Sequence, residues 1–386
     1  MSTALDLTAM RPTWVDIDAA AFVRNVEAAG RRLPEGARLV AVMKANAYGH
    51  GAADLARRLT AKHVAMIAII MLEEALELRR AGVTLPILIL GPLNERQIAV
   101  AAGNDMTVGI PGPEELEAAA KVARDRDVHI HLKIDSGMGR MGSTEPELPR
   151  VIELLRSAPR LKLDAIYTHF ANSSDPDDPY TDVQTANFDR LVHVLRDAGI
   201  SAPLQHRANS GATMRGLVRP GEYARVGIAL YGADAVDTGG TRLEPVMRWR
   251  TEIARLKTLP QGHPVGYGET FHTIVPSRIA TLPVGYADGY NRLLSNRADV
   301  IVRGRRAPIV GRVSMDLITI DVTAIPGASL GDEVVLLGSQ DGETIPVEEI
   351  ARKLGTIAYE VFCSVSARVP RIYRDGSRVT IRSRFA

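Results

Sequence analysis

Short apolar runs alternate with segments of helical periodicity over the first two-thirds of the chain. The apolar runs, each long enough for one buried strand, cover residues 39–43, 64–70, 87–90, 106–110, 128–134, 163–169, 204–209 and 223–231. Between most of them, apolar positions recur at helical spacing over residues 52–59, 73–80, 94–102, 113–124, 145–157 and 181–198. Eight strands alternating with helices predict a (β/α)8 barrel. A doubly wound open sheet is the alternative, because the number of strands does not prove closure.

Punctuating residues support the predicted helices. Asn94 stands where a helix N-cap is expected, and Gly82, Gly103 and Gly199 stand where helices would end. These positions separate each helix from the strand that follows it.

The pattern changes after residue 243. Strand-like runs then follow one another without long helices, over residues 246–259, 278–285, 299–310, 316–322 and 333–337, with a hairpin around Asp375-Gly376. One helix is expected near residues 347–354. We therefore expect a barrel domain over residues 12–243 and a mainly β domain over residues 244–386. Residues 1–17 are expected to pack with the β domain, and 13–17 to pair with it.

Composition narrows the class of protein. The chain has 386 residues, 46% of them hydrophobic and 24% charged, which is typical of a globular enzyme. A net charge of +2 gives no sign of a nucleic-acid partner. The single cysteine, Cys363, excludes an intramolecular disulfide and a cysteine-based zinc site, and it fits a reducing cytoplasm. The longest apolar run, 64–72, is too short to cross a membrane, and the N-terminus lacks a signal-peptide pattern.

Lys44 is the most informative candidate residue. It follows the apolar run 39–43 and comes just before Tyr48 and Gly49. Barrel enzymes carry their chemistry at the C-terminal ends of strands. An amine at that place can hold an aldehyde cofactor as a Schiff base, although a lone strand-end lysine is more often simply solvated.

Further polar residues follow the other predicted strands. Arg140 lies in a glycine-rich loop, His169 ends the sixth strand, and Ser210 follows the seventh. Each alone has an ordinary explanation: a loop salt bridge, a buried structural histidine, or a helix cap. Together at one barrel mouth they predict a site. Ser210 and the backbone amides of Gly227 and Ile228 suit a phosphate, and no Walker-type loop is present.

The ordered motifs resemble alanine racemase from about residue 12 to residue 373. They are the run around Lys44, Gly137-Met138-Gly139-Arg140, Tyr167-Thr168-His169-Phe170, the segment 225–232, Gly266-Tyr267-Gly268, the segment 285–289, the segment 311–316 and Tyr359-Glu360. The resemblance implies a pyridoxal 5'-phosphate (PLP) enzyme with a barrel, a C-terminal β domain and a head-to-tail homodimer. It implies interconversion of L-alanine and D-alanine by two-base proton transfer on a PLP aldimine, with D-alanine supplied for peptidoglycan synthesis.

The resemblance also implies individual roles. Lys44 holds the cofactor and serves the D-face of the substrate, while Tyr267 serves the L-face from the partner subunit. Arg225 faces the pyridine nitrogen, and Arg140 with the Met315 amide holds the substrate carboxylate. The remaining implied contacts are Tyr48, Ser210, Gly227, Ile228 and Tyr359 for the phosphate, His169 beside the ring, Tyr286 at the substrate entrance, and Lys133 as a position that is often carbamylated.

Three alternatives compete with this interpretation. The nearest is a racemase of broader amino-acid specificity. A PLP-dependent decarboxylase of the same architecture is expected to use a cysteine base and a glutamate at the pyridine nitrogen, where this chain has Tyr267 and Arg225. A non-catalytic PLP carrier with a lone barrel would have no need of the β domain.

Overall fold

The computed structural model describes residues 10–233, 243–375 and 378–384. They form two compact units, which we describe separately. One unit comprises Val23–Ala47 and Ala52–Leu243, and the other comprises Met1–Phe22, Tyr48–Gly51 and Glu244–Ala386. The division into domains at 243/244 is kept as a proposal. Residues 1–9 of the segment expected to pack with the β domain lie outside the described part.

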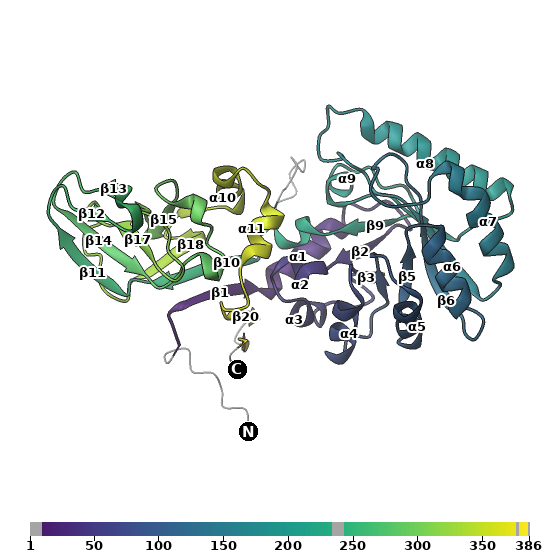
Figure 1. The fold of residues 1–386 in the computed structure, drawn as a ribbon, viewed down its shortest axis with the longest axis horizontal. Helices are drawn as coiled ribbons and strands as arrows, with labels where there is room; N and C mark the ends of the chain where they lie inside the picture. Colours follow the sequence, from purple (N-terminus) through teal and green to yellow (C-terminus); the bar gives the residue numbers. More distant parts are fainter. Residues whose placement is uncertain (1–9, 234–242, 376–377, 385–386) are drawn as a thin grey trace, which may run out of the picture. The chain divides into compact units, whose positions relative to one another are not determined.

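The first unit contains a nearly closed barrel of eight parallel strands, as predicted (Figure 1). Hydrogen bonding runs in the order β8-β7-β6-β5-β4-β3-β2-β9, so the first and last strands of the barrel are paired. The strands are β2 Arg38–Val42, β3 Met66–Ile69, β4 Ile87–Ile89, β5 Thr107–Ile110, β6 Val128–Lys133, β7 Leu161–Tyr167, β8 Leu204–His206 and β9 Tyr223–Val226. Pairing of β2 with β9 favours the barrel over the open sheet.

The helices of this unit lie outside the strands (Figure 1). They are α1 Ala19–Gly30, α3 Ala52–Ala56, α4 Leu72–Arg80, α5 Glu95–Gly103, α6 Pro113–Val122, η2 Glu145–Glu147, α7 Leu148–Ser157, α8 Tyr180–Asp197 and α9 Ser210–Met214. Asn94 caps α5 as predicted, since its Oδ1 accepts from the amide of Gln97 at 3.0 Å. Gly82 and Gly199 follow helices in the left-handed conformation, and Gly103 is the last residue of α5, so helices end at these three glycines as predicted.

The last barrel strand is shorter than its apolar run. β9 ends at Val226, and the 3-10 helix η3 follows at Ile228–Tyr231. The prediction of one strand over 223–231 was wrong because η3 is buried as completely as β9, so hydrophobicity does not mark the boundary. A seam separates β8, which pairs only with β7, from β9. Among the described residues one backbone bond crosses it, from the Arg225 amide to the Ala208 carbonyl at 3.0 Å.

Beyond β2 the chain makes a left-handed helical turn, α2 Lys44–Tyr48. Ala45, Asn46, Ala47 and Tyr48 have φ angles of 52°, 54°, 54° and 51°. This conformation costs a non-glycine residue roughly 1–2 kcal/mol. Two side chains stabilise the turn: Glu74 accepts from the Ala45 amide at 2.6 Å, and Asn46 accepts from the Ala52 amide at 2.8 Å.

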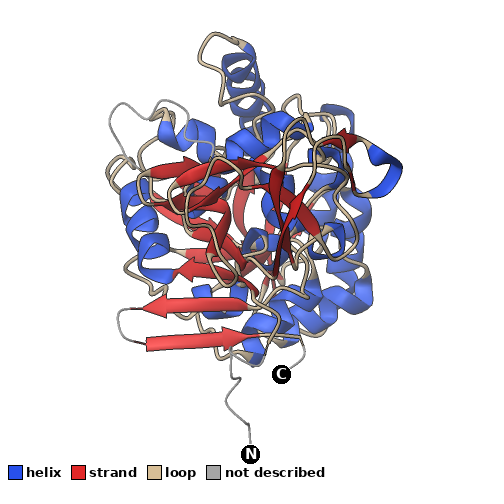
Figure 2. Cartoon of the chain, turned by 90° about the vertical axis from the view of Figure 1, so that its left-hand side faces the viewer, coloured by secondary structure: helices blue, strands red, loops and turns tan. Residues whose placement is uncertain are grey.

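The second unit is built on a sheet in which the first strand of the chain is central. The order is β16-β15-β18-β10-β1-β20-β21, with β19 paired to β18. The strands are β1 Thr13–Asp18, β10 Met247–Glu252, β15 Asp299–Val302, β16 Arg305–Pro308, β18 Glu333–Gln340, β19 Glu343–Ile345, β20 Arg371–Asp375 and β21 Arg378–Arg382. Figure 2 shows β20 and β21 as two arrows that run in opposite directions, as expected of a hairpin. Gly376 of the predicted turn lies outside the described residues.

A smaller sheet and a short hairpin complete this unit. The sheet consists of β11 Arg255–Leu259, β14 Ser277–Leu282 and β17 Ile318–Asp321, and the hairpin of β12 Pro264–Val265 and β13 Phe271–His272. The helix α10 Val347–Leu354 lies where it was predicted, and α11 Ala358–Ser364 was not predicted. Leu259, Val265, Ile279 and Val310 form a buried cluster against which Phe271 packs. This cluster anchors the hairpin whose tip carries Tyr267.

Candidate active site

Four cationic side chains gather at the C-terminal ends of the barrel strands. Lys44 follows β2, Lys133 is the last residue of β6, Arg140 lies in the loop after β6, and Arg225 is the third residue of β9. Burial lowers the pKa of the Lys133 ammonium to about 8, and the charges of Arg140, Arg225 and Lys44 act in the same direction. Asp135 opposes them. A region so rich in positive charge favours an anionic ligand.

Arg225 is buried and held by both of its terminal nitrogens. Nη1 donates to Nδ1 of His206 at 2.6 Å and to its carbonyl at 2.9 Å. Nη2 donates to the Thr168 carbonyl at 2.6 Å and to Nδ1 of His169 at 2.9 Å. None of the hydrogen bonds within the described residues uses Nε, so that donor is left for a ligand. Burial lowers the guanidinium pKa to about 10, which still leaves it charged at neutral pH.

His169 is a neutral acceptor in this arrangement. Burial lowers its pKa well below the ordinary value, and the charges of Arg225 and Lys133 add to that effect. Because a guanidinium can only donate, Nδ1 of His169 accepts and its proton lies on Nε2. His169 therefore holds one side of the Arg225 guanidinium.

Ser210 and Gly227 face each other across the barrel seam. Asn209, and not Ser210, is the N-cap of α9, because its Oδ1 accepts from the Ala212 amide at 3.1 Å. The hydroxyl of Ser210 instead accepts from the amide of Gly227 at 2.9 Å, immediately before Ile228 begins η3. A hydroxyl and a backbone amide thus meet beside Arg225.

The glycine-rich loop after β6 is organised by Asp135. Its Oδ1 accepts from the amides of Gly137 and Met138, both at 2.9 Å, and its carboxylate also accepts from Gly139. Arg140 follows directly. The sequence interpretation did not recognise this role, although aspartate before a glycine-rich loop is a common turn signal.

The second unit carries the other predicted residues. Tyr48 and Tyr359 lie with their ring centroids 5.6 Å apart. Burial raises the pKa of Tyr48 well above its ordinary value, with Tyr359 and Cys363 contributing. The phenol of Tyr48 therefore stays protonated and can donate a hydrogen bond.

Tyr267, Tyr286 and Met315 are connected through one loop of the second unit. Met315 and the preceding Ser314 accept from the amides of Ala287 and Tyr286, both at 3.0 Å. On the other side of the loop, Arg312 packs so closely on the Tyr267 turn that a Cβ at Gly268 would lie 3.4 Å from the guanidinium carbon. Tyr267 is 73% exposed, Met315 53% and Tyr286 41%.

Comparison with known proteins identifies the family. The N-terminal domain model of alanine racemase matches residues 17–235, and the C-terminal domain model matches residues 246–373. The chain belongs to the alanine racemase family. It is therefore a PLP-dependent isomerase, as the sequence predicted.

Relatives are similar over nearly the whole chain. Alanine racemase 2 of Caldanaerobacter subterraneus subsp. tengcongensis is 41% identical, covering 94% of this chain and 95% of that protein. The alanine racemase structure from Bacillus anthracis with bound L-Ala-P has a TM-score of 0.89 at 37% identity, covering 97% and 98%. The structure from Bartonella henselae, with covalently bound pyridoxal phosphate, has a TM-score of 0.85 at 28% identity, covering 95% and 100%.

The residues of the barrel mouth fit this cofactor. PLP carries a phosphate and a phenolic oxygen, both of which suit a cluster of cations; burial, and then the neighbouring positive charges, lower the pKa of Lys133 in this cluster. Nε of Arg225, which no hydrogen bond within the described residues uses, could donate to the pyridine nitrogen. The amine of Lys44 would be available to the aldehyde.

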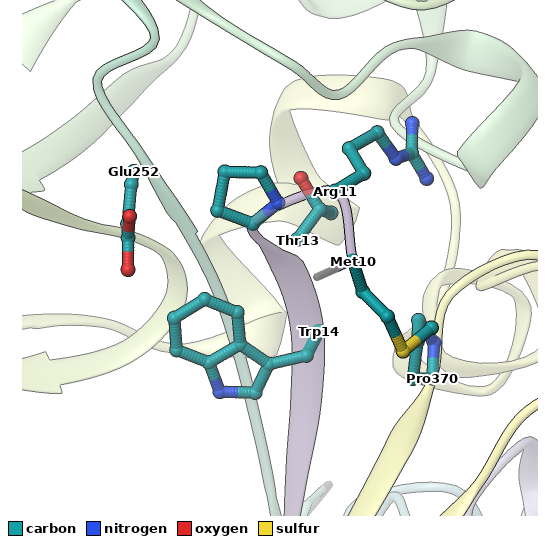
Figure 3. Close-up of a pocket in the computed structure, with 7 residues that line it drawn as sticks. Met10, Arg11, Thr13, Trp14, Glu252 and Pro370 are labelled. Carbon is teal, nitrogen blue, oxygen red and sulfur yellow. The ribbon is translucent and has the colours of Figure 1, made fainter. Parts of the chain in front are cut away.

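The second unit also contains a pocket that is separate from its predicted site residues. It has a volume of about 400 Å³ and is lined by Met10, Arg11, Pro12, Thr13, Trp14, Glu252 and Pro370 (Figure 3). None of the predicted catalytic or cofactor-binding residues lines it. No described helix has both the length and the hydrophobicity needed to cross a bilayer.

Proposed function

We propose that this chain racemises alanine with Lys44 and Tyr267 as the two proton-transfer groups. The supporting observation is the convergence of Lys44, Lys133, Arg140 and Arg225 at the C-terminal ends of the barrel strands. An amine for an aldehyde and several cations for a phosphate and a carboxylate are what this reaction requires.

Inversion at the substrate Cα needs a proton acceptor on each face. When bound, PLP delocalises the negative charge that develops as the Cα proton leaves. Lys44 moves the proton on the D-face and Tyr267 moves it on the L-face. An ordinary phenol has a pKa of about 10, so Tyr267 needs positive charge nearby when it acts as a base.

Arg225 sets the electronic character of the site. Its guanidinium remains charged at neutral pH despite burial, and it has no lone pair to accept a proton. It can donate to the pyridine nitrogen without protonating that atom. The ring is then a weak electron sink, which favours rapid return of the proton to Cα and disfavours transamination.

The other predicted residues bind and orient. Arg140 holds the substrate carboxylate together with the amide of Met315, and Tyr286 lines the entrance. The phosphate is held by the hydroxyl of Ser210, the amides of Gly227 and Ile228, and the two phenols of Tyr48 and Tyr359.

Lys133 is the proposed site of carbamylation. It is 6% exposed, and its pKa of about 8 makes its amine partly neutral near neutral pH. Carbon dioxide adds to the nitrogen of a neutral amine, one proton is released to solvent, and the product is a carbamate anion. The modification would convert a destabilising cation into a partner for Arg140.

We further propose that Tyr267 acts in the site of a partner subunit, in a homodimer. Its exposure of 73% leaves it unsuited to catalysis unless another surface covers it. Large apolar side chains of the same unit are also exposed, namely Ile274, Val275, Leu293, Met315 and Leu317. Exposed apolar side chains of this size, when contiguous, mark interaction surfaces.

Mixed dimers test that proposal. Neither Lys44→Ala nor Tyr267→Phe should be active alone. After random exchange in an equal mixture, about half of the dimers are hybrids with one intact site of two, so about a quarter of wild-type activity should return. Verified exchange without recovery would place both residues in one chain's site.

The racemase proposal is tested directly in deuterated water. Purified holoenzyme and L-alanine should lose the Cα proton signal in NMR while D-alanine appears by chiral chromatography. Exchange without inversion would refute the role of Tyr267. Exchange with inversion on larger amino acids as well as on alanine would favour the broader racemase.

The proposal includes supply of D-alanine for peptidoglycan from a cytoplasmic enzyme. A single cysteine, which cannot form an intramolecular disulfide, supports that location. A deletion strain that requires added D-alanine, and that a copy of the gene rescues, would establish the biosynthetic role.

A further inference from the structure

A row of buried side chains continues from Arg225 into the barrel. Nη1 of Arg225 lies 2.6 Å from Nδ1 of His206, and Nε2 of His206 lies 2.9 Å from Nδ1 of His131. All three residues are at most 3% exposed. They come from three strands, β9, β8 and β6.

Only one arrangement of protons satisfies this row. The guanidinium has donors and no acceptor, so Nδ1 of His206 must accept. A neutral imidazole carries one proton, which then lies on Nε2 of His206 and is donated to Nδ1 of His131. Burial keeps both rings neutral by lowering their pKa values, in His131 to about 3.

The ring of His206 has little other freedom. Tyr167 stacks on it with centroids 4.6 Å apart and an interplanar angle of 5°. The guanidinium carbon of Arg225 in turn lies 5.3 Å from the Tyr167 ring centroid. Because the imidazole plane of His206 is fixed, only its tautomer can still differ, that is, which ring nitrogen carries the proton.

We propose that His131 is a positioning residue for Arg225, because it accepts the Nε2 proton of His206 and so fixes the tautomer that can accept from the guanidinium. In the other tautomer, a proton on Nδ1 would face the donor Nη1, and that side of the guanidinium would be displaced. This inference rests on the proposed function only for the role of Arg225 at the pyridine nitrogen. Nothing in the sequence motifs singled out His131, although it lies two residues from Lys133 and so on the same face of β6.

Two substitutions of His131 separate the hydrogen bond from the volume. His131→Asn keeps an acceptor oxygen near the position of Nδ1, whereas His131→Leu fills the space without an acceptor. His129→Leu is the matched control, because His129 is exposed near the start of the same strand, and its Nδ1 bonds to Asp164 at 2.8 Å.

The first readout is the tautomer of His206, measured by two-bond ¹H–¹⁵N NMR of histidine-labelled holoenzyme, with His206→Gln for assignment. We expect a protonated Nε2 in the wild type, in His131→Asn and in His129→Leu, and a mixture in His131→Leu. The second readout is the dissociation constant of PLP, which should rise about tenfold in His131→Leu, as for other partners that orient a ligand-binding group, and be largely restored in His131→Asn.

The inference is overturned by a proton on Nδ1 of wild-type His206. It is overturned equally if His131→Leu folds with wild-type circular dichroism and binds PLP as tightly as the wild type. If His131→Leu does not fold, two other results test the inference. The wild type must carry the proton on Nε2 of His206, and His131→Asn must bind PLP nearly as tightly as the wild type. A wild-type protein with the expected tautomer but no alanine racemisation would refute the proposed function and leave this inference standing.

Discussion

A lysine that is buried among other cations has unusual chemistry available to it. At pH 8 about half of the Lys133 side chains would be neutral, because the pKa is about 8, whereas an ordinary lysine is almost fully charged. We expect holoenzyme in ¹³C-bicarbonate to show a carbamate carbon signal that strengthens as the pH rises through 8 and is lost on acidification. Lys133→Arg keeps the charge and should abolish the signal, while Lys162→Arg at a half-buried site away from the barrel mouth should retain it. A signal that survives Lys133→Arg would assign the carbamate elsewhere.

The carboxylate of Asp135 shapes the loop that places Arg140, the residue proposed to bind the substrate carboxylate. It accepts from three successive backbone amides and so shapes the loop that carries Arg140. Loss of hydrogen bonds to a charged group costs about 1.5–3 kcal/mol. We expect Asp135→Ala to raise KM for alanine by about tenfold with a much smaller change in kcat, because Arg140 binds substrate and transition state alike. Asp321→Ala, which removes a similar turn cap in the second unit, serves as the control. A KM equal to that of the control would contradict the role.

At the level of elements, the left-handed turn predicts that an alanine-to-glycine substitution stabilises the protein in the turn and destabilises it in an ordinary helix. Ala45 is exposed with φ 52°, where glycine is more stable than alanine by about 1 kcal/mol. Ala118 lies inside α6, where the same substitution costs about 1 kcal/mol. Urea unfolding should therefore show Ala45→Gly stabilised and Ala118→Gly destabilised. Destabilisation by both would mean that the turn is not strained.

Hydrophobic patterns predict buried strands well, but they do not predict where a buried strand ends or which hand a turn takes. The eight barrel strands were predictable because a parallel sheet covered on both faces leaves continuous apolar runs. The end of β9 was not, since Ile228–Tyr231 is equally buried in a 3-10 helix. The turn at Lys44–Tyr48 was also hidden, because alanine-rich sequence favours the right-handed helix and tertiary contacts impose the left-handed one.

Some residues of the candidate site were likewise predictable from the sequence, and others were not. Lys44 and Arg140 stood out because charged groups that follow apolar strands contrast with their surroundings, whereas Arg225 came from the family resemblance. His206 and His131 were missed because their role depends on a contact between residues 75 positions apart. Sequence spacing within one strand does not reveal such a contact.

For the whole molecule, the buried histidines predict sensitivity to acid. His131, with a pKa of about 3, and His169 and His206, with pKa values well below 6.5, are neutral when folded and take up protons on unfolding below about pH 6.5. The free energy of unfolding should therefore fall as the pH decreases from about 6.5 to about 5, by up to about 1.4 kcal/mol per pH unit for each histidine. Urea unfolding at several pH values measures the slope. His131→Asn should reduce this slope by the contribution of one histidine, up to about 1.4 kcal/mol per pH unit. An unchanged slope would refute the assignment to His131.

The position of β1 has a consequence for how the protein is made. Thr13 bonds to Thr251, which is 238 residues away, and β1 lies between β10 and β20 in the sheet. On the ribosome, the strand that joins the two halves of this sheet is therefore synthesised first, and it must wait for both neighbours to emerge. A fragment that begins at residue 244 lacks the middle of its own sheet. A chimera that takes the C-terminal region from a relative must therefore take the first strand from that relative as well.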